Sequence, residues 1–166
     1  MRRIWILIIF VMIGCKKEIP IPSLDGIIVT TGSEAVMNQS THFHPNILFD
    51  QVIGSTNNLN TDWIIFNDSE IILNVQFDSI RLVKSINVSC NKIQDQSIDL
   101  PASIFIEGRA SSNTWNEIAR LSESQIKALK NTNIRINIEG QYFEELSIKI
   151  KPKKNKAVAF SEISLN

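Results

Sequence analysis

The sequence predicts an all-β domain: an antiparallel β-sandwich with at most one short helix. Three observations support this fold class. Apolar and polar residues alternate with period two in several segments, these segments are rich in β-branched residues, and only one stretch has a helical pattern. Strands with this alternation bury one face and pair antiparallel, so two sheets packed face to face are expected.

The alternating segments follow one another along the chain. Their apolar positions are Ile71, Leu73, Val75 and Phe77; Ile86, Val88 and Cys90; Ile104 and Ile106; Ile134, Ile136 and Ile138; and Leu146, Ile148 and Ile150. The helical stretch is SESQIKALK, which begins at Ser122, where a serine or glutamate caps one or two turns and Ile126 and Leu129 share a face. The basic segment KPKKNK, residues 151–156, separates the last two strands and is predicted to be a solvated hairpin loop.

The N-terminal residues predict export and lipid attachment. Two arginines precede an apolar run, residues 4–13, which is too short to span a bilayer and ends at a glycine followed by Cys15. This pattern resembles the signals of bacterial lipoproteins. The resemblance implies that residues 1–14 are removed and that the Cys15 thiol is acylated; an ordinary signal peptide or an N-terminal anchor is the alternative. Residues 15–25, with two prolines, are then expected to form a lipidated tether.

Charge and cysteine content narrow the class of protein further. Removing residues 1–14 takes away two of the 17 basic residues and none of the 17 acidic ones, so the mature chain carries a formal net charge of −2. This balance gives no indication of nucleic-acid binding. Once Cys15 carries lipid, Cys90 has no disulfide partner, and its place among alternating apolar residues predicts a small buried side chain. Residues 26–166 have the length of one domain.

Five segments, taken in order, resemble the discoidin-like, or coagulation factor 5/8 type C, modules. They are ILFDQVIGSTNNLNTDWIIF, SEIILNVQFDSIRLVKSINVSC, LPASIFIEGRASSNTWNEIARL, EELSIKIK and AVAFSEISL. The resemblance covers roughly residues 26–166 and is closest to the modules attached to bacterial hexosaminidases and other sugar-cleaving enzymes. It implies an antiparallel jelly-roll β-sandwich, galactose-binding-domain-like, that binds carbohydrate through loops at one end.

The same resemblance implies a structural cation. In such modules an acidic residue after the opening leucine and a glutamate near the last strand help to hold it, and here these positions are Asp50 and Glu162. The loop GSTNNLNTD is rich in oxygen ligands, which suits calcium. Gln51 stands where the family usually has a glycine. The alternative is that Asp50 caps a turn and that Glu162 is an exposed strand residue.

Other candidate residues are few. His42 and His44 have no further histidine or cysteine motif to complete a zinc site, so none is assigned. Trp63 and Trp115 match family positions that pack against the sandwich, and both are predicted to be core residues. The polar loop residues that could contact sugar hydroxyls are Asn57, Asn58, Asp95, Gln96 and Arg109.

The sequence favours a binding protein over an enzyme. It contains no nucleophile elbow, no phosphate-binding loop and no histidine with a plausible triad partner. The first hypothesis is a non-catalytic lipoprotein of the bacterial cell envelope that binds a glycan. Lys16 replaces the aspartate associated with inner-membrane retention in enteric bacteria, which indicates the outer membrane. The loop after Cys90 lacks the aromatic residue often found in related modules, which favours the alternative, a structural or assembly lipoprotein that binds an envelope protein.

Overall fold

The computed structural model describes residues 26–33, 35–36, 48–51, 53–54, 63–110 and 114–166. The predicted signal peptide and tether, with Cys15, lie outside these residues, as do His42 and His44. In chain order the strands are β1 (Ile27–Thr31), β2 (Ala35–Val36), β3 (Ile64–Phe66), β4 (Ile71–Asn91), β5 (Ser103–Arg109), β6 (Asn116–Ser122), β7 (Asn133–Lys151) and β8 (Val158–Leu165). The 3-10 helix η2 (Gln94–Gln96) and the helix α2 (Glu123–Ala128) complete the described elements.

Two long strands build both layers of the sandwich. The first part of β4 pairs with the last part of β7, which in turn pairs with β5, and β6 lies beyond β5. The last part of β4 pairs with β8 and with the first part of β7, while β3 lies beyond β8. All these pairings are antiparallel, so the predicted all-β sandwich is confirmed. The four alternating segments predicted in residues 71–90 and 134–150 are two continuous strands of 21 and 19 residues.

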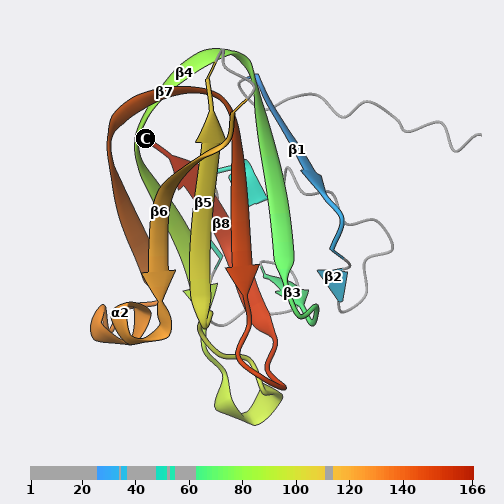
Figure 1. Ribbon diagram of the computed structural model, residues 1–166. Helices are drawn as coiled ribbons and strands as arrows, with labels where there is room; N and C mark the ends of the chain where they lie inside the picture. Colours follow the sequence, from blue (N-terminus) through green and yellow to red (C-terminus); the bar gives the residue numbers. More distant parts are fainter. Residues whose placement is uncertain (1–25, 34, 37–47, 52, 55–62, 111–113) are drawn as a thin grey trace, which may run out of the picture.

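The two long strands bend where they pass from one layer to the other. In β4 the register shifts between Gln76 and Arg81 and again between Val83 and Ser85, as expected for bulges that bend a strand. In β7 the bend contains Gly140, whose φ of 58° is easily adopted only without a Cβ atom. Figure 1 shows β4 and β7 arching over the same end of the molecule. We call this the arch end and the opposite one the loop end.

The alternation seen in the sequence becomes one apolar core between the layers. Strand β5 is buried at every second residue, at Ile104, Ile106 and Gly108. Phe66 of β3 and Phe160 of β8 are fully buried, and their ring centroids are 5.9 Å apart. Cys90 is 1% exposed, which confirms the prediction of a buried side chain, and this burial raises the pKa of its thiol far above the ordinary value.

The two tryptophans predicted to be core residues, Trp63 and Trp115, differ in burial. Trp63 is buried in a separate apolar cluster with Ile98, Ala157 and Ala159, as predicted. Trp115 is 38% exposed, so the prediction that it is a core residue is wrong. It lies just before β6, where the guanidinium of Arg109 covers its ring at 5.2 Å from the centroid. A cation is attracted to the face of an indole ring. The contact with Arg109 therefore stabilises Trp115 in its exposed position outside the core.

The predicted helix is present and short. The backbone N–H of Ser122 donates to Gln125 Oε1 at 2.8 Å, which satisfies one donor at the start of α2. Ile126 packs into the core, whereas Leu129 lies after the last residue of α2 and is exposed. No helix in the described part of the chain is long and apolar enough to cross a membrane.

Candidate functional site

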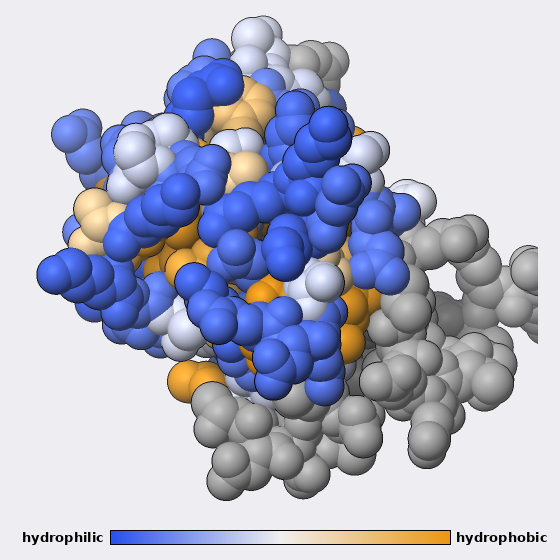
Figure 2. All heavy atoms as spheres, turned by 90° about the horizontal axis from the view of Figure 1, so that it is seen from below, coloured by the Kyte–Doolittle hydropathy of each residue, from blue (hydrophilic) through white to orange (hydrophobic). Residues whose placement is uncertain are grey.

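Three connections meet at the loop end and enclose a hollow of about 660 Å³. They are the β3–β4 connection, the loop that contains η2, and the β7–β8 connection. The lining residues, which we call the lysine pocket, are Asn67, Asp68, Ser69, Gln96, Ser97, Lys151, Pro152, Lys153, Lys154, Asn155, Lys156 and Ala157. Figure 2 looks onto the molecule from this side and shows hydrophilic side chains over most of the described surface.

The β7–β8 connection is not the predicted hairpin. Strand β4 lies between β7 and β8 in the strand order, so residues 152–157 cross from one layer of the sandwich to the other. Backbone hydrogen bonds hold this crossing against the η2 loop. The Ala157 N–H donates to Ser97 O at 3.0 Å, and the Asp99 N–H donates to Ala157 O at 3.0 Å. At the other end of the segment the Ala102 N–H donates to Lys151 O at 2.7 Å. The basic segment is therefore fixed at both ends and forms one wall of the pocket.

A tight turn brings the lysines together. The Lys156 N–H donates to Lys153 O at 3.0 Å. Asn155 sits at the third position of this turn with φ 58°, a left-handed conformation that asparagine adopts more easily than most residues. Pro152, buried just before the turn, restricts the backbone at its start. The local sequence thus explains why a run of like charges forms an ordered turn.

One lysine of the turn is neutralised. Lys153 Nζ lies 2.8 Å from Asp99 Oδ2 and 3.8 Å from Glu123 Oε1 of α2. Burial raises the pKa of Asp99, but hydrogen bonds from Lys153 and the Leu100 N–H, together with nearby lysine charges, outweigh it and hold that pKa below its ordinary value. The pair ties the lysine turn to the η2 loop.

Replacing Asp99 by asparagine tests this tie. We expect Asp99→Asn to lower the free energy of unfolding by about 1–2 kcal/mol at pH 7, since it removes a charge-assisted hydrogen bond between two largely buried side chains. Because folding lowers the pKa of Asp99, its contribution is full above the unfolded-state pKa of about 4 and is lost as the pH falls through the folded-state pKa. Urea unfolding from pH 7 to pH 3 should show the difference between the two proteins narrowing below about pH 4.

The exposed neighbour Asp95 provides the matched control. Asp95→Asn in the same loop should change the free energy of unfolding little at either pH, because Asp95 makes no ion pair with a described residue. A difference between wild type and Asp99→Asn that stays constant down to pH 3 would contradict the assigned ion pair.

The other lysines of the pocket carry unpaired charge. Lys151, Lys154 and Lys156 make no ion pair with any residue that the structure describes, whereas Lys153 does. Lys151 and Lys154 are exposed and Lys156 is partly exposed. Asp68 is the single acidic residue among those lining the pocket. The site therefore has a local excess of positive charge, although the whole chain has a formal net charge of 0.

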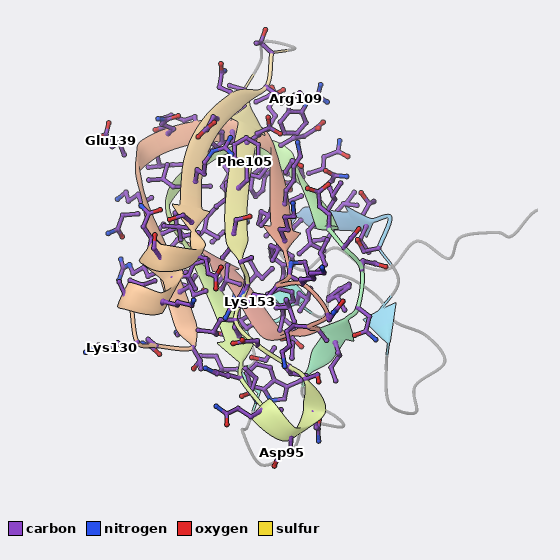
Figure 3. The ribbon with its side chains drawn as sticks, turned by 60° about the horizontal axis from the view of Figure 1, so that its bottom comes forward. Asp95, Phe105, Arg109, Lys130, Glu139 and Lys153 are labelled. Carbon is purple, nitrogen blue, oxygen red and sulfur yellow. The ribbon has the colours of Figure 1, made fainter. Side chains whose placement is uncertain are left out.

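The predicted ligand residues that the structure describes, Asp95, Gln96 and Arg109, do not all lie at one end of the sandwich. Gln96 lines the lysine pocket, and Asp95 is exposed next to it in η2. Arg109 ends β5 at the arch end, far from Asp95 (Figure 3), and donates to Glu145 Oε1 at 2.6 Å. This bond and the contact with Trp115 occupy its guanidinium. Asn57 and Asn58 fall outside the described residues.

The predicted cation residues lie in another region. Glu162 of β8 is 3% exposed, so the alternative that it is an exposed strand residue is wrong. Gln51, directly after Asp50, lines a hollow of about 300 Å³ together with Glu162. Gln51 has φ 65°, so the chain makes a left-handed turn here without the family's usual glycine. No three His, Cys, Asp or Glu side chains of the described residues form a metal-binding group.

The carboxylates of Asp50 and Glu162 suit a hard cation such as calcium, which binds oxygen ligands in loose geometry. Further ligands would have to come from elsewhere, and residues 55–62 of the predicted oxygen-rich loop are outside the described part. The two carboxylates are thus of the chemical type that calcium binds, and the calcium site stays a prediction.

The sequence alone did not single out the lysine pocket. The basic segment was evident, but its charge alone is typical of a solvated loop. The basic segment becomes part of a pocket only because Asn67, Asp68 and Ser69 line the same hollow. These three residues precede β4 and are distant from the basic segment in sequence. A signal was present in Pro152, because a proline within a lysine run favours an ordered turn.

Comparisons with known proteins identify the fold. No family model matches the sequence, and no curated protein matches it. The family 32 carbohydrate-binding module of NanJ from Clostridium perfringens, solved with galactose, superimposes with a TM-score of 0.60 at 12% identity, covering 84% of this chain and 93% of that one. GH31 CBM32-2, solved with GalNAc, gives a TM-score of 0.63 at 11% identity, covering 86% and 98%.

A third solved structure of similar fold is named for a different ligand, chitosan. Chitosan-binding module 1 of a chitosanase/glucanase from Paenibacillus sp. IK-5 gives a TM-score of 0.58 at 12% identity, covering 85% of this chain and 95% of that one. Family 32 modules are discoidin-like, galactose-binding-like domains, so the resemblance seen in the sequence is confirmed for the fold. At these identities the likeness concerns the fold and leaves the ligand to be argued from the site.

Proposed function

We propose that this chain is a non-catalytic, lipid-anchored carbohydrate-binding protein of the bacterial cell envelope. The observation that carries the proposal is a polar pocket formed by loops at one end of a discoidin-like sandwich. Structurally similar modules were solved with galactose and with GalNAc. Amide and hydroxyl groups of Asn67, Ser69 and Gln96 are suitable partners for sugar hydroxyls.

The anchor is the acylated Cys15, and the location is the outer membrane. The lipoprotein-like signal at residues 1–14 supports both. The described domain starts at Gly26, whose carbonyl accepts a hydrogen bond from the Asp78 N–H at 2.9 Å, at the arch end of β4. The chain therefore enters the sandwich opposite the lysine pocket, and a lipid attached before this point leaves the pocket accessible.

Cys15→Ser should move the protein from the detergent phase to the aqueous phase in a partition assay.

The second candidate is a structural lipoprotein that binds an envelope protein. Exposed apolar side chains at the arch favour it: Ile80 is 49%, Leu82 38% and Tyr142 60% exposed. Leu82 and Tyr142 are cross-strand neighbours, so they form part of one apolar surface. This surface is at the end opposite the lysine pocket, so the two functions would use different surfaces.

A glycan array tests the first candidate. The full chain in detergent would be screened in calcium and in EDTA, beside Asp50→Ala and the matched variant Glu139→Ala, which removes an exposed carboxylate at the arch end (Figure 3). We expect binding to at least one glycan, weakened by EDTA and by Asp50→Ala but not by Glu139→Ala. Binding that is indifferent to calcium and to Asp50 would reject the calcium site alone. No binding by a sample that circular dichroism shows to be folded would reject the carbohydrate proposal and favour the protein partner.

A further inference from the structure

The lysine pocket differs from a site built to stack a neutral sugar. A sugar ring presents an apolar face that packs on aromatic side chains, yet none of the described residues that line this pocket is aromatic. Trp63 belongs to the buried cluster that contains the lining residue Ala157, and it is only 6% exposed. The polar groups that line the pocket are the ammonium groups of lysines, amides, hydroxyls and one carboxylate, that of Asp68. The chemistry of the pocket thus favours a charged ligand.

Positive charge is in excess in the pocket, because four lysines and one acidic residue, Asp68, line it. Lys151, Lys154 and Lys156 are without ion pairs among the described residues, while the charge of Lys153 is balanced by Asp99. The turn between Lys153 and Lys156 keeps Lys154 and Lys156 on one short segment of fixed backbone. A lysine ammonium is a compact point charge that attracts carboxylate and sulfate groups alike. Fixed lysines beside Asn67, Ser69 and Gln96 can bind anionic groups and hydroxyls of one ligand.

We infer that the lysine pocket binds an acidic glycan, a sugar chain that carries carboxylate or sulfate groups, with Lys154 and Lys156 as the main charge contacts. The inference rests on the proposed carbohydrate function and names its substrate class. It separates this protein from a module that takes chitosan, because a cationic polymer is repelled by the same lysines. The position of the pocket opposite Gly26 favours a glycan in the surroundings over the membrane to which the chain is proposed to be tethered.

The test is a binding titration of the full chain in detergent at low salt. The ligands are oligogalacturonides, neutral galacto-oligosaccharides of the same length, a sulfated galactan, chitosan oligomers, polyglutamate and vesicles containing phosphatidylglycerol. We expect binding to the oligogalacturonides or the sulfated galactan, which identifies the anionic group, and weakening of that binding by added salt. Chitosan should not bind.

Charge-reversal variants locate the contact. Lys154→Glu/Lys156→Glu should weaken binding about tenfold or more, whereas Lys84→Glu/Arg135→Glu, an equal charge change at exposed positions outside the pocket, should change it less than about threefold. Both variants should unfold at the same temperature as wild type to within a few degrees, since all four side chains are at least partly exposed.

Each remaining outcome overturns the inference in a distinct way. Equal weakening by both variants, or equal binding of polyglutamate, would show attraction by net charge without a sugar site. Binding of the neutral galacto-oligosaccharides alone would leave the proposed carbohydrate function intact and reject the acidic ligand. In detergent-free samples the proposed lipid anchor would insert into charged and uncharged vesicles alike, so phosphatidylcholine vesicles are the control. Tighter binding to the phosphatidylglycerol vesicles that Lys154→Glu/Lys156→Glu abolishes, in place of glycan binding, would assign the lysines to a membrane surface. Binding of no ligand by the folded chain would reject both this inference and the proposed function.

Discussion

Replacing Phe160 by alanine is expected to lower the free energy of unfolding by about 3–5 kcal/mol, the range for deleting a buried aromatic ring. Phe160 is fully buried on β8 and pairs with Ile64 on one side and Cys90 on the other. Its ring also packs on Phe66. Removing it leaves a cavity where the two layers meet, and the neighbouring strands cannot close over it without breaking their register. Urea unfolding followed by circular dichroism measures the change.

The exposed Trp115 provides the contrast. Trp115→Ala removes a larger side chain, but it loses mainly the contact with Arg109 and is expected to cost about 1 kcal/mol or less. A loss for Trp115→Ala as large as that for Phe160→Ala would contradict the exposed position of Trp115 and mean that it packs in the core.

Replacing Gly108 by alanine is expected to cost about 1–3 kcal/mol, because the new methyl group has no space. A Cβ atom at this buried position in β5 would lie 2.5 Å from Ile118 Cδ1 and 2.6 Å from Phe143 Cδ1. Phe143 is 4% exposed, near the bend of β7, and cannot turn outward without losing its own burial. The thermal midpoint should fall by several degrees.

Gly32→Ala is the matched control for this substitution. A Cβ atom at Gly32 meets no heavy atom within 4 Å, and its φ is not in the left-handed range. The variant should therefore be neutral or more stable by up to about 1 kcal/mol, since alanine restricts the unfolded chain more than glycine does. Equal effects of the two variants would contradict the close packing around Gly108.

The sequence by itself determined which residues of the alternating strands face the core, although not the exposure of Trp115. In a strand, alternate side chains point to opposite faces, so the periodicity around Ile104 and Ile148 was enough to predict buried positions. The same local logic predicted α2, through Ser122 and Ile126, and the burial of Cys90. The alternating segments predicted a β-sandwich, and the resemblance to discoidin-like modules, carried by the order of these segments, predicted which type of sandwich it is.

Only the tertiary structure decided the site. Gln96 was a candidate from its sequence, but its neighbours Asn67, Lys154 and Lys156 join it through three connections that are far apart along the chain. Likewise Asp95 and Arg109, both polar loop candidates, lie at opposite ends of the sandwich. The physical reason is that side-chain alternation is a local property, whereas the meeting of loops depends on strand order and on where long strands bend.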